Sequence, residues 1–185
     1  MKTSLDCVPC FLRQAMDAAR MASTDTALHE QIVREVLRWV SDMALDESPP
    51  VLGQRIHRRL RELTGVEDPY RAAKDYLNRM ALSLLPELKA EIEAASDPLV
   101  MGVRLAIAGN VMDMGVNGNV RESDVRNSIR QALAEPFVGE QDGFRKAVAE
   151  ARSILYLADN AGEIAMDRLL IEQLSPARIT LAVRG

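Results

Sequence analysis

Residues 153–183 read SILYLADNAGEIAMDRLLIEQLSPARITLAV, and this stretch decides the predicted fold of the C-terminal part of the chain. Segments 153–158 and 178–183 are short apolar runs without polar alternation, which is typical of strands buried on both faces. Segment 164–174 between them has the composition and length of a helix. The order strand, helix, strand predicts one β-α-β unit whose two strands run parallel.

The predicted parallel sheet has too few strands to be complete. Two parallel strands do not form an independent sheet, because each strand needs pairing partners and cover on both faces. The sequence of 185 residues ends at Gly185, at the carboxyl edge where open α/β sheets bind ligands. We therefore expect the chain to be truncated, with the rest of its α/β domain missing.

The rest of the chain is predicted to be helical, since Ala, Leu, Arg and Glu are frequent and apolar residues recur at helical spacing. Pro49-Pro50 is expected to end the segment whose apolar stripe runs from Leu28 to Val40. The helix that begins at Asp68-Pro69 is expected to stop or kink at Pro86, with a short helix continuing to about Ala95. Ser123 is the expected N-cap of a later helix. The predicted fold class is α+α/β, with a helical bundle over residues 1–96 and the first β-α-β unit of an incomplete Rossmann-like domain over 97–185.

Composition excludes some classes of function. The 23 basic and 27 acidic residues give a net charge of −4, and aromatic residues make up 4% of the chain. Neither value suggests a nucleic-acid partner. No run of 18 apolar residues is present, and the first ten residues lack the apolar region of a signal peptide. We expect no membrane partner and a cytoplasmic location.

The strongest candidate site follows the first predicted strand. Asp159 and Asn160 offer hard oxygen ligands suited to a divalent cation such as magnesium or manganese. The next helix begins near Gly162 and Glu163, and its backbone N–H groups could hold a phosphate. The alternative is that Asp159 or Asn160 only caps this helix.

Two further pairs have helical spacing. Asn110 and Asp113 are three residues apart, so both could face one cavity, although a solvated helix end would give the same pattern. Lys74 and Asn78 are one turn apart, and Lys74 could contact a phosphate unless the pair is simply exposed.

Cys7 and Cys10 lie in the sequence DCVPC at residues 6–10. This spacing fits half of a zinc site or a redox pair. Only His29 and His57 could add histidine ligands, and nothing in the sequence places them nearby. Two reduced cysteines at the start of a helix remain the plain alternative.

Four segments, taken together and in this order, resemble the metal-dependent damage-control phosphatase family. This ARMT-like family, also called domain of unknown function eighty-nine, has a branch with an N-terminal Cys-x-x-Cys. The matching segments are DCVPC at 6–10, DPY at 68–70 with Lys74 and Asn78, GNVMD at 109–113, and LADNAGE at 157–163.

The resemblance implies a helical N-terminal domain, a Rossmann-like domain and hydrolysis of small phosphate monoesters such as sugar phosphates or damaged phosphometabolites. It implies a divalent ion (Mn, Ni, Co or Mg) held by Asp159, Asn160 and an aspartate after the following strand. That third aspartate would come soon after Gly185. The candidate catalytic residues are Asp159, Asn160 and Asp113, and the candidate substrate contacts are Asn110, Gly162, Glu163, Lys74 and Asn78.

Two other functions remain open. A strand followed by an acidic, glycine-containing loop can bind S-adenosylmethionine, although Gly162 is the single glycine here and such loops need more. The chain could also be a non-catalytic helical module that assembles through zinc at Cys7 and Cys10 or through a partner. Assembly into a homo-oligomer is compatible with each of these functions.

Overall fold

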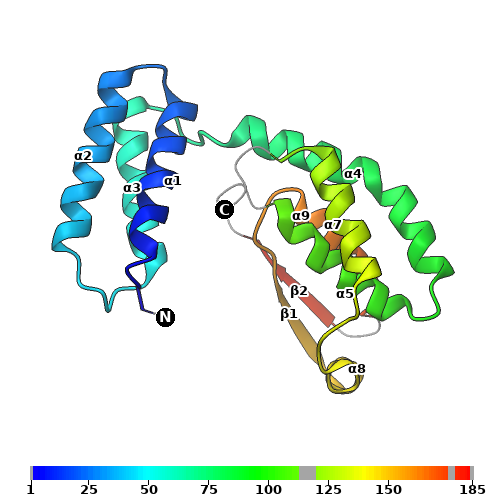
Figure 1. The fold of residues 1–185 in the computed structure, drawn as a ribbon. Coiled ribbons are helices and arrows are strands. Elements are labelled where there is room, and N and C mark those ends of the chain that lie inside the picture. The colour runs from blue at the N-terminus through cyan, green and yellow to red at the C-terminus, as the bar shows by residue number, and fades with distance from the viewer. Residues whose placement is uncertain (1, 113–119, 175–177, 184–185) are drawn as a thin grey trace. The chain divides into compact units, whose positions relative to one another are not determined.

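The computed structural model describes residues 2–112, 120–174 and 178–183 of the chain (Figure 1). It is mostly helical, with a small parallel sheet of two strands. In chain order, the elements are α1 (Cys7–Ala22), α2 (Thr26–Asp42), α3 (Pro49–Thr64), α4 (Arg71–Ala94), α5 (Pro98–Gly109), the short 3₁₀ helix η1 (Asn110–Met112), α7 (Glu122–Ala134), α8 (Gln141–Glu150), β1 (Ser153–Leu157), α9 (Glu163–Ile171) and β2 (Arg178–Ala182).

The chain divides into two compact units, Met1–Ala72 and Ala73–Gly185. The sequence-based domain boundary at 96/97 assigns α4 to the first domain, whereas this division places nearly all of α4 in the second unit. The reason is packing, because α4 contributes Leu77, Leu84 and Leu88 to the core that it shares with α5, α7 and α9.

The first unit contains α1, α2 and α3. Each helix buries one apolar stripe in a common core, represented by Phe11, Ile32 and Ile56. The Asp25 side chain caps α2 by accepting the N–H of Ala27 at 2.9 Å. Gly65 follows α3 in a left-handed conformation with φ of 69°, the arrangement that glycine favours after a helix end.

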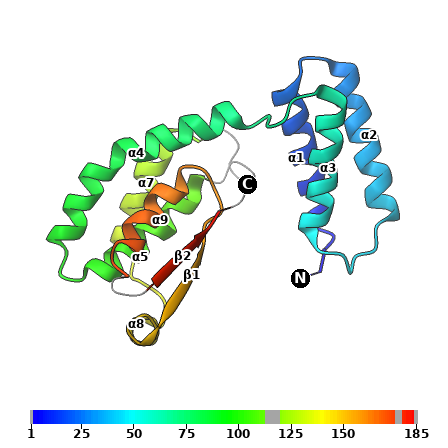
Figure 2. The same ribbon diagram turned by 180° about the vertical axis from the view of Figure 1, so that it is seen from behind.

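The second unit places α4, α5, α7 and α9 on one side of the sheet, as Figures 1 and 2 show. Its main core joins apolar side chains of α4, α5, α7 and α9. A smaller cluster joins Ala106 of α5 and Leu170 of α9 to Ile154 and Tyr156 of β1. The sheet therefore packs on α5 and α9 through one of its faces.

The two strands are parallel, as predicted, with Ser153 paired to Arg178 and Leu157 to Ala182. The expectation that they are buried on both faces is wrong for the described residues. Leu155 and Leu157 of β1 are 63% and 72% exposed, while the alternate side chains are partly buried. An apolar run shows which residues avoid water, but it does not show how many layers cover the sheet.

Two predicted helix limits, at Pro49-Pro50 and at Ser123, need correction. Pro49-Pro50 does not end α2, because α2 already ends at Asp42 and Pro49 is the first residue of α3, where its missing N–H is tolerated. Pro86 lies inside α4, which ends at Ala94, close to the predicted helical limit at Ala95. Ser123 lies inside α7, whose N-cap is Arg121.

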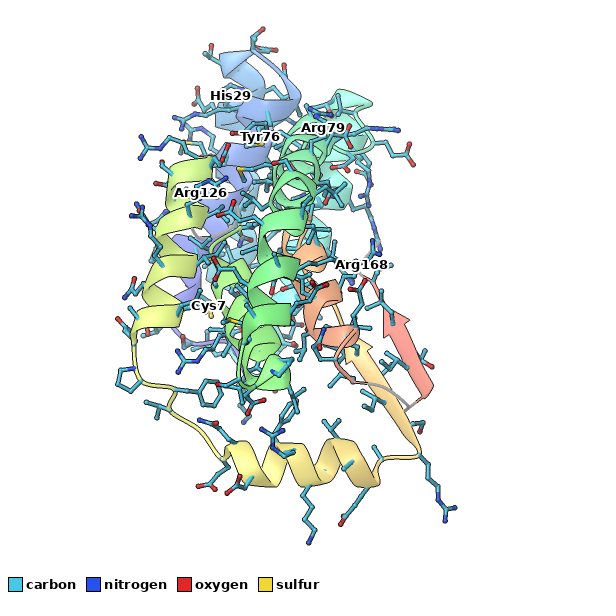
Figure 3. All side chains as sticks on the ribbon, turned by 90° about the vertical axis from the view of Figure 1, so that its right-hand side faces the viewer. Cys7, His29, Tyr76, Arg79, Arg126 and Arg168 are labelled. Atoms are coloured by element: carbon cyan, nitrogen blue, oxygen red, sulfur yellow. The ribbon has the colours of Figure 1, made fainter. Side chains whose placement is uncertain are left out.

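Ion pairs join α4 to its neighbours in the second unit. Arg126 of α7 contacts Glu87 at 3.0 Å, and Lys89 contacts Glu172, at the end of α9, at 2.8 Å. Arg168 of α9 pairs with the same Glu172 at 2.7 Å, and Figure 3 shows Arg126 and Arg168 projecting from their helices. Exposed pairs of this kind contribute little stability, about 0–1 kcal/mol each.

Helices α5 and α9 approach each other through two glycines. A Cβ added at Gly102 would lie 3.1 Å from the Leu170 backbone Cα, and one at Gly109 would lie 3.0 Å from Cβ of Met166. These distances leave no room for a side chain on this face of α5. The buried face of α9 is therefore held close to α5 at both ends of the contact.

No helix in the described part of the chain is long and apolar enough to cross a bilayer.

We predict that Gly102→Ala destabilises the second unit by about 1–3 kcal/mol, because the added methyl group meets backbone and forces α5 and α9 apart. Gly143→Ala is the matched control, since its Cβ would meet only the Cβ of Glu140 at 3.7 Å. This control change should be neutral or should stabilise α8 by up to about 1 kcal/mol. Urea unfolding measures both variants, and equal stability of the two would contradict the close contact.

Candidate functional site

The candidate site lies in the loop from β1 to α9. The ladder of the sheet continues one residue past β1, where the N–H of Ala158 donates to the carbonyl of Ala182 at 2.9 Å. Asp159 and Asn160 follow directly, at the carboxyl end of the strand. The Asp159 side chain is exposed and Asn160 is half-buried, so both residues are accessible from solvent at this edge.

The Asn160 amide is held by Glu163. Its Nδ2 donates to Oε2 of Glu163 at 2.9 Å, and Glu163 is only 7% exposed. An ionised carboxylate can only accept, so the amide must turn its NH₂ group toward Glu163. The amide oxygen, Oδ1, therefore points away from Glu163 and can serve a cation.

The first turn of α9 uses its N–H groups within the chain. Gly162 donates to Oδ1 of Asn78 at 2.7 Å, Ile164 to the carbonyl of Asn160 at 3.3 Å, and Ala165 to the carbonyl of Gly162 at 3.0 Å. A phosphate held by the Gly162 amide, as expected from the sequence, would have to displace Asn78. This hydrogen bond between Gly162 and Asn78 was not predicted from the sequence.

A cavity of about 390 Å³ lies between α5, β1 and α9. Its walls are mainly apolar, and its polar lining residues are Asn110, Tyr156, Glu163 and Asp167. Asn110 is the first residue of η1, which directly follows the end of α5 at Gly109. Its side chain is exposed. The fold thus brings Asn110 and Glu163 to one cavity, whereas Asp113 lies outside the described residues.

The partly buried Tyr156 and the buried Asp167 form a pair that was not predicted from the sequence. The Tyr156 hydroxyl donates to Oδ1 of Asp167 at 2.7 Å, and Asp167 is 4% exposed. Burial raises the pKa of Asp167 above its ordinary value, and the hydrogen bond from Tyr156 partly opposes this shift. Burial, followed by the bond to Asp167, also raises the pKa of Tyr156. The sequence signal that could have revealed this pair is Asp167 itself, an acidic residue within the apolar stripe of α9.

The remaining candidates lie elsewhere. Lys74 is exposed on α4, one turn before Asn78. Cys7 and Cys10 are free thiols near the start of α1, in the first unit, and Sγ of Cys7 lies 3.6 Å from the Ser4 hydroxyl. Within residues 2–112, 120–174 and 178–183, no group of three or more His, Cys, Asp and Glu side chains could hold a metal. The described residues therefore do not complete a zinc site around the two cysteines.

We predict that Asp167→Asn becomes increasingly stabilising, relative to the parent chain, as the pH rises from about 4 to 7. In the folded state, the pKa of Asp167 lies above its ordinary value of 3.8, so folding favours the protonated acid. The stability that this preference contributes is present below the unfolded pKa and is lost as pH rises through the folded pKa. The neutral amide can still accept from Tyr156 and escapes this loss.

Thermal unfolding at several pH values gives the difference in Tm between Asp167→Asn and the parent. Asp142→Asn, on the exposed surface of α8, is the matched control and should show a difference that changes little with pH. A Tm difference for Asp167→Asn that stays constant between pH 4 and 7 would rule out a raised pKa.

Comparison with known proteins identifies relatives of the chain. The damage-control phosphatase ARMT1-like domain matches residues 3–185. A damage-control phosphatase from Archaeoglobus fulgidus is 35% identical over 191 residues, which cover 100% of this chain and 65% of the relative. A damage-control phosphatase from Pyrococcus horikoshii is 25% identical over 177 residues, which cover 94% of this chain and 60% of the relative.

The fold also matches a solved structure. The crystal structure of a DUF89 family protein from Pyrococcus horikoshii superposes with a TM-score of 0.79 at 23% identity, covering 100% of this chain and 64% of that one. The chain thus spans less than two thirds of the length of these relatives. Because the domain match extends over residues 3–185, the chain belongs to the damage-control phosphatase ARMT1-like, or DUF89, family.

Proposed function

We propose that this chain carries the metal-binding loop of a divalent-metal-dependent phosphatase that hydrolyses small phosphate monoesters, such as sugar phosphates or damaged phosphometabolites. Its relatives are named damage-control phosphatases, which supports a phosphatase-type reaction. The observation that carries the proposal is the hydrogen bond from Asn160 to the buried Glu163, because it turns the NH₂ group of the Asn160 amide toward Glu163 and the amide oxygen away from it.

The donor set fits a hard divalent cation. Asp159 offers an exposed carboxylate and Asn160 an oriented amide oxygen, and Mg²⁺-type sites commonly combine one or two such ligands with water. The third ligand, an aspartate after the second strand, rests on the family resemblance. When bound, the ion would polarise a phosphoryl oxygen and lower the pKa of a coordinated water.

The chain's own residues would prepare the site around this ion. Glu163 fixes the orientation of Asn160, which is the task of a residue that supports a metal ligand. Asn110 lines the same cavity as Glu163 and can donate its amide N–H to a substrate oxygen. Lys74 supplies an exposed cation on α4 that can attract a phosphate. The proposed role of Asp113, positioning the attacking water, rests on the sequence alone.

Several finer expectations belong to the same proposal. They are a complete Rossmann-like sheet in the whole protein, Mn, Ni, Co or Mg as the metal, a cytoplasmic location, a small phosphorylated metabolite as the partner, and homo-oligomer formation.

Zinc at Cys7 and Cys10 would need ligands beyond the described residues, since these hold no third partner for the pair. Methyl transfer is less well supported, because the loop after β1 holds one glycine, Gly162, whose N–H is already bonded.

We predict that Asp159→Asn weakens Mn²⁺ binding about tenfold or more, because an exposed carboxylate ligand is lost. The control is Asp142→Asn, which removes the same charge from exposed α8 and should leave affinity unchanged. Isothermal titration of the chain with MnCl₂ measures both variants. Equal Mn²⁺ affinity of the two variants would overturn the assignment of Asp159.

We also expect the whole protein to release phosphate from a small sugar phosphate only when a divalent ion is added. A chelator should stop this release. A malachite-green assay with Mn²⁺, Ni²⁺, Co²⁺ or Mg²⁺ tests the reaction class. Hydrolysis that persists at full rate in the chelator would contradict metal dependence.

A further inference from the structure

The contact between Asn78 and Gly162 joins two segments that are 84 positions apart in the sequence. Asn78 lies near the start of α4, and its half-buried side chain accepts the Gly162 N–H at 2.7 Å. Gly162 itself is buried and is the N-cap residue of α9. Without this acceptor, a buried N–H would lose its partner, which costs free energy.

Gly162 has little freedom to move. Its φ of +83° is a conformation that other residues rarely adopt. A Cβ at this position would lie 2.6 Å from Sδ of Met112, and 3.1 Å from both Cβ and the carbonyl oxygen of Leu77. The backbone of Gly162 therefore rests directly against α4 and η1, with the hydrogen bond to Asn78 fixing its direction.

The turn that holds the candidate metal ligands lies between two anchors. One anchor is the bond from the Ala158 N–H to the carbonyl of Ala182 in the sheet, and the other is the bond from Gly162 to Asn78. Asp159, Asn160 and Ala161 are the residues between these anchors. Moving Gly162 would move the start of α9, and with it Glu163, the residue that orients the Asn160 amide.

We propose that Asn78 is a positioning residue for the metal-binding loop, which it holds in place by accepting the Gly162 N–H, and that it supports metal binding without contacting the metal. This role differs from the substrate contact expected from the sequence. Its link to metal binding rests on the proposed function, whereas the anchoring of Gly162 does not.

The first test measures amide hydrogen exchange at Gly162 in the metal-free chain by NMR. Asn78→Leu keeps a similar side-chain volume but removes the acceptor, and we expect Gly162 to exchange about tenfold faster or more, as the loss of one buried hydrogen bond implies. Asn78→Asp keeps an acceptor oxygen and should retain slow exchange. Asn127→Leu makes the same replacement on the exposed surface of α7 and should leave Gly162 unchanged.

The second test is titration of the same variants with MnCl₂. Asn78→Leu should weaken Mn²⁺ binding about tenfold, the usual range for residues that orient a ligand. Asn78→Asp should bind Mn²⁺ as tightly as the parent or more tightly, because it keeps the acceptor. If Asn78→Leu does not fold, Asn78→Ala removes the same acceptor without adding branched apolar volume.

The outcomes separate the two proposals. Fast exchange of Gly162 in the parent, or slow exchange in Asn78→Leu and Asn78→Ala, overturns the anchoring role. Unchanged exchange with weakened Mn²⁺ binding also overturns it, because Asn78 would then act on the ion directly. A parent chain that protects Gly162, with equal Mn²⁺ affinity of Asp159→Asn and Asp142→Asn, contradicts the proposed metal ligand and leaves the anchor standing.

Discussion

The close approach of α5 and α9 is the constraint on which the rest of the second unit depends. Gly102 and Gly109 are seven residues apart on α5, so both face α9, and neither has a side chain to keep the helices apart. The packing of α9 against α5 removes Glu163 and Asp167 from water. A buried carboxylate needs a hydrogen-bond donor, and each of these finds one at the strand or its loop, Tyr156 for Asp167 and Asn160 for Glu163.

This packing divides the acidic residues around the loop into two kinds. Glu163 and Asp167 are buried and accept hydrogen bonds from Asn160 and Tyr156 within the second unit. Asp159 is exposed at the end of β1, where a cation can reach it without passing through the core. Glu163, which holds the Asn160 amide, and Asp159, the proposed metal ligand, thus lie four residues apart and differ in burial.

Much of the fold was predictable because it depends on local rules. The N-caps Asp25 and Asp97 accept N–H groups at the starts of α2 and α5, and Gly65 follows α3 with a positive φ. The parallel β-α-β unit followed from two apolar runs around a helical segment. Family membership was also predictable, since four short motifs in a fixed order carry it. Pro86 lies within α4, because a proline removes one hydrogen bond from a helix but need not end it when the helix is well packed.

The sequence by itself determined the helices, the strand order, the family and the position of Asp159 and Asn160 at a strand end. Each of these depends on residues close together in the chain. The tertiary structure alone decided that one sheet face is covered, that Tyr156 pairs with Asp167, and that Asn78 holds Gly162 rather than only facing solvent. These contacts join different elements, and no spacing rule within one segment specifies which partners packing will bring together.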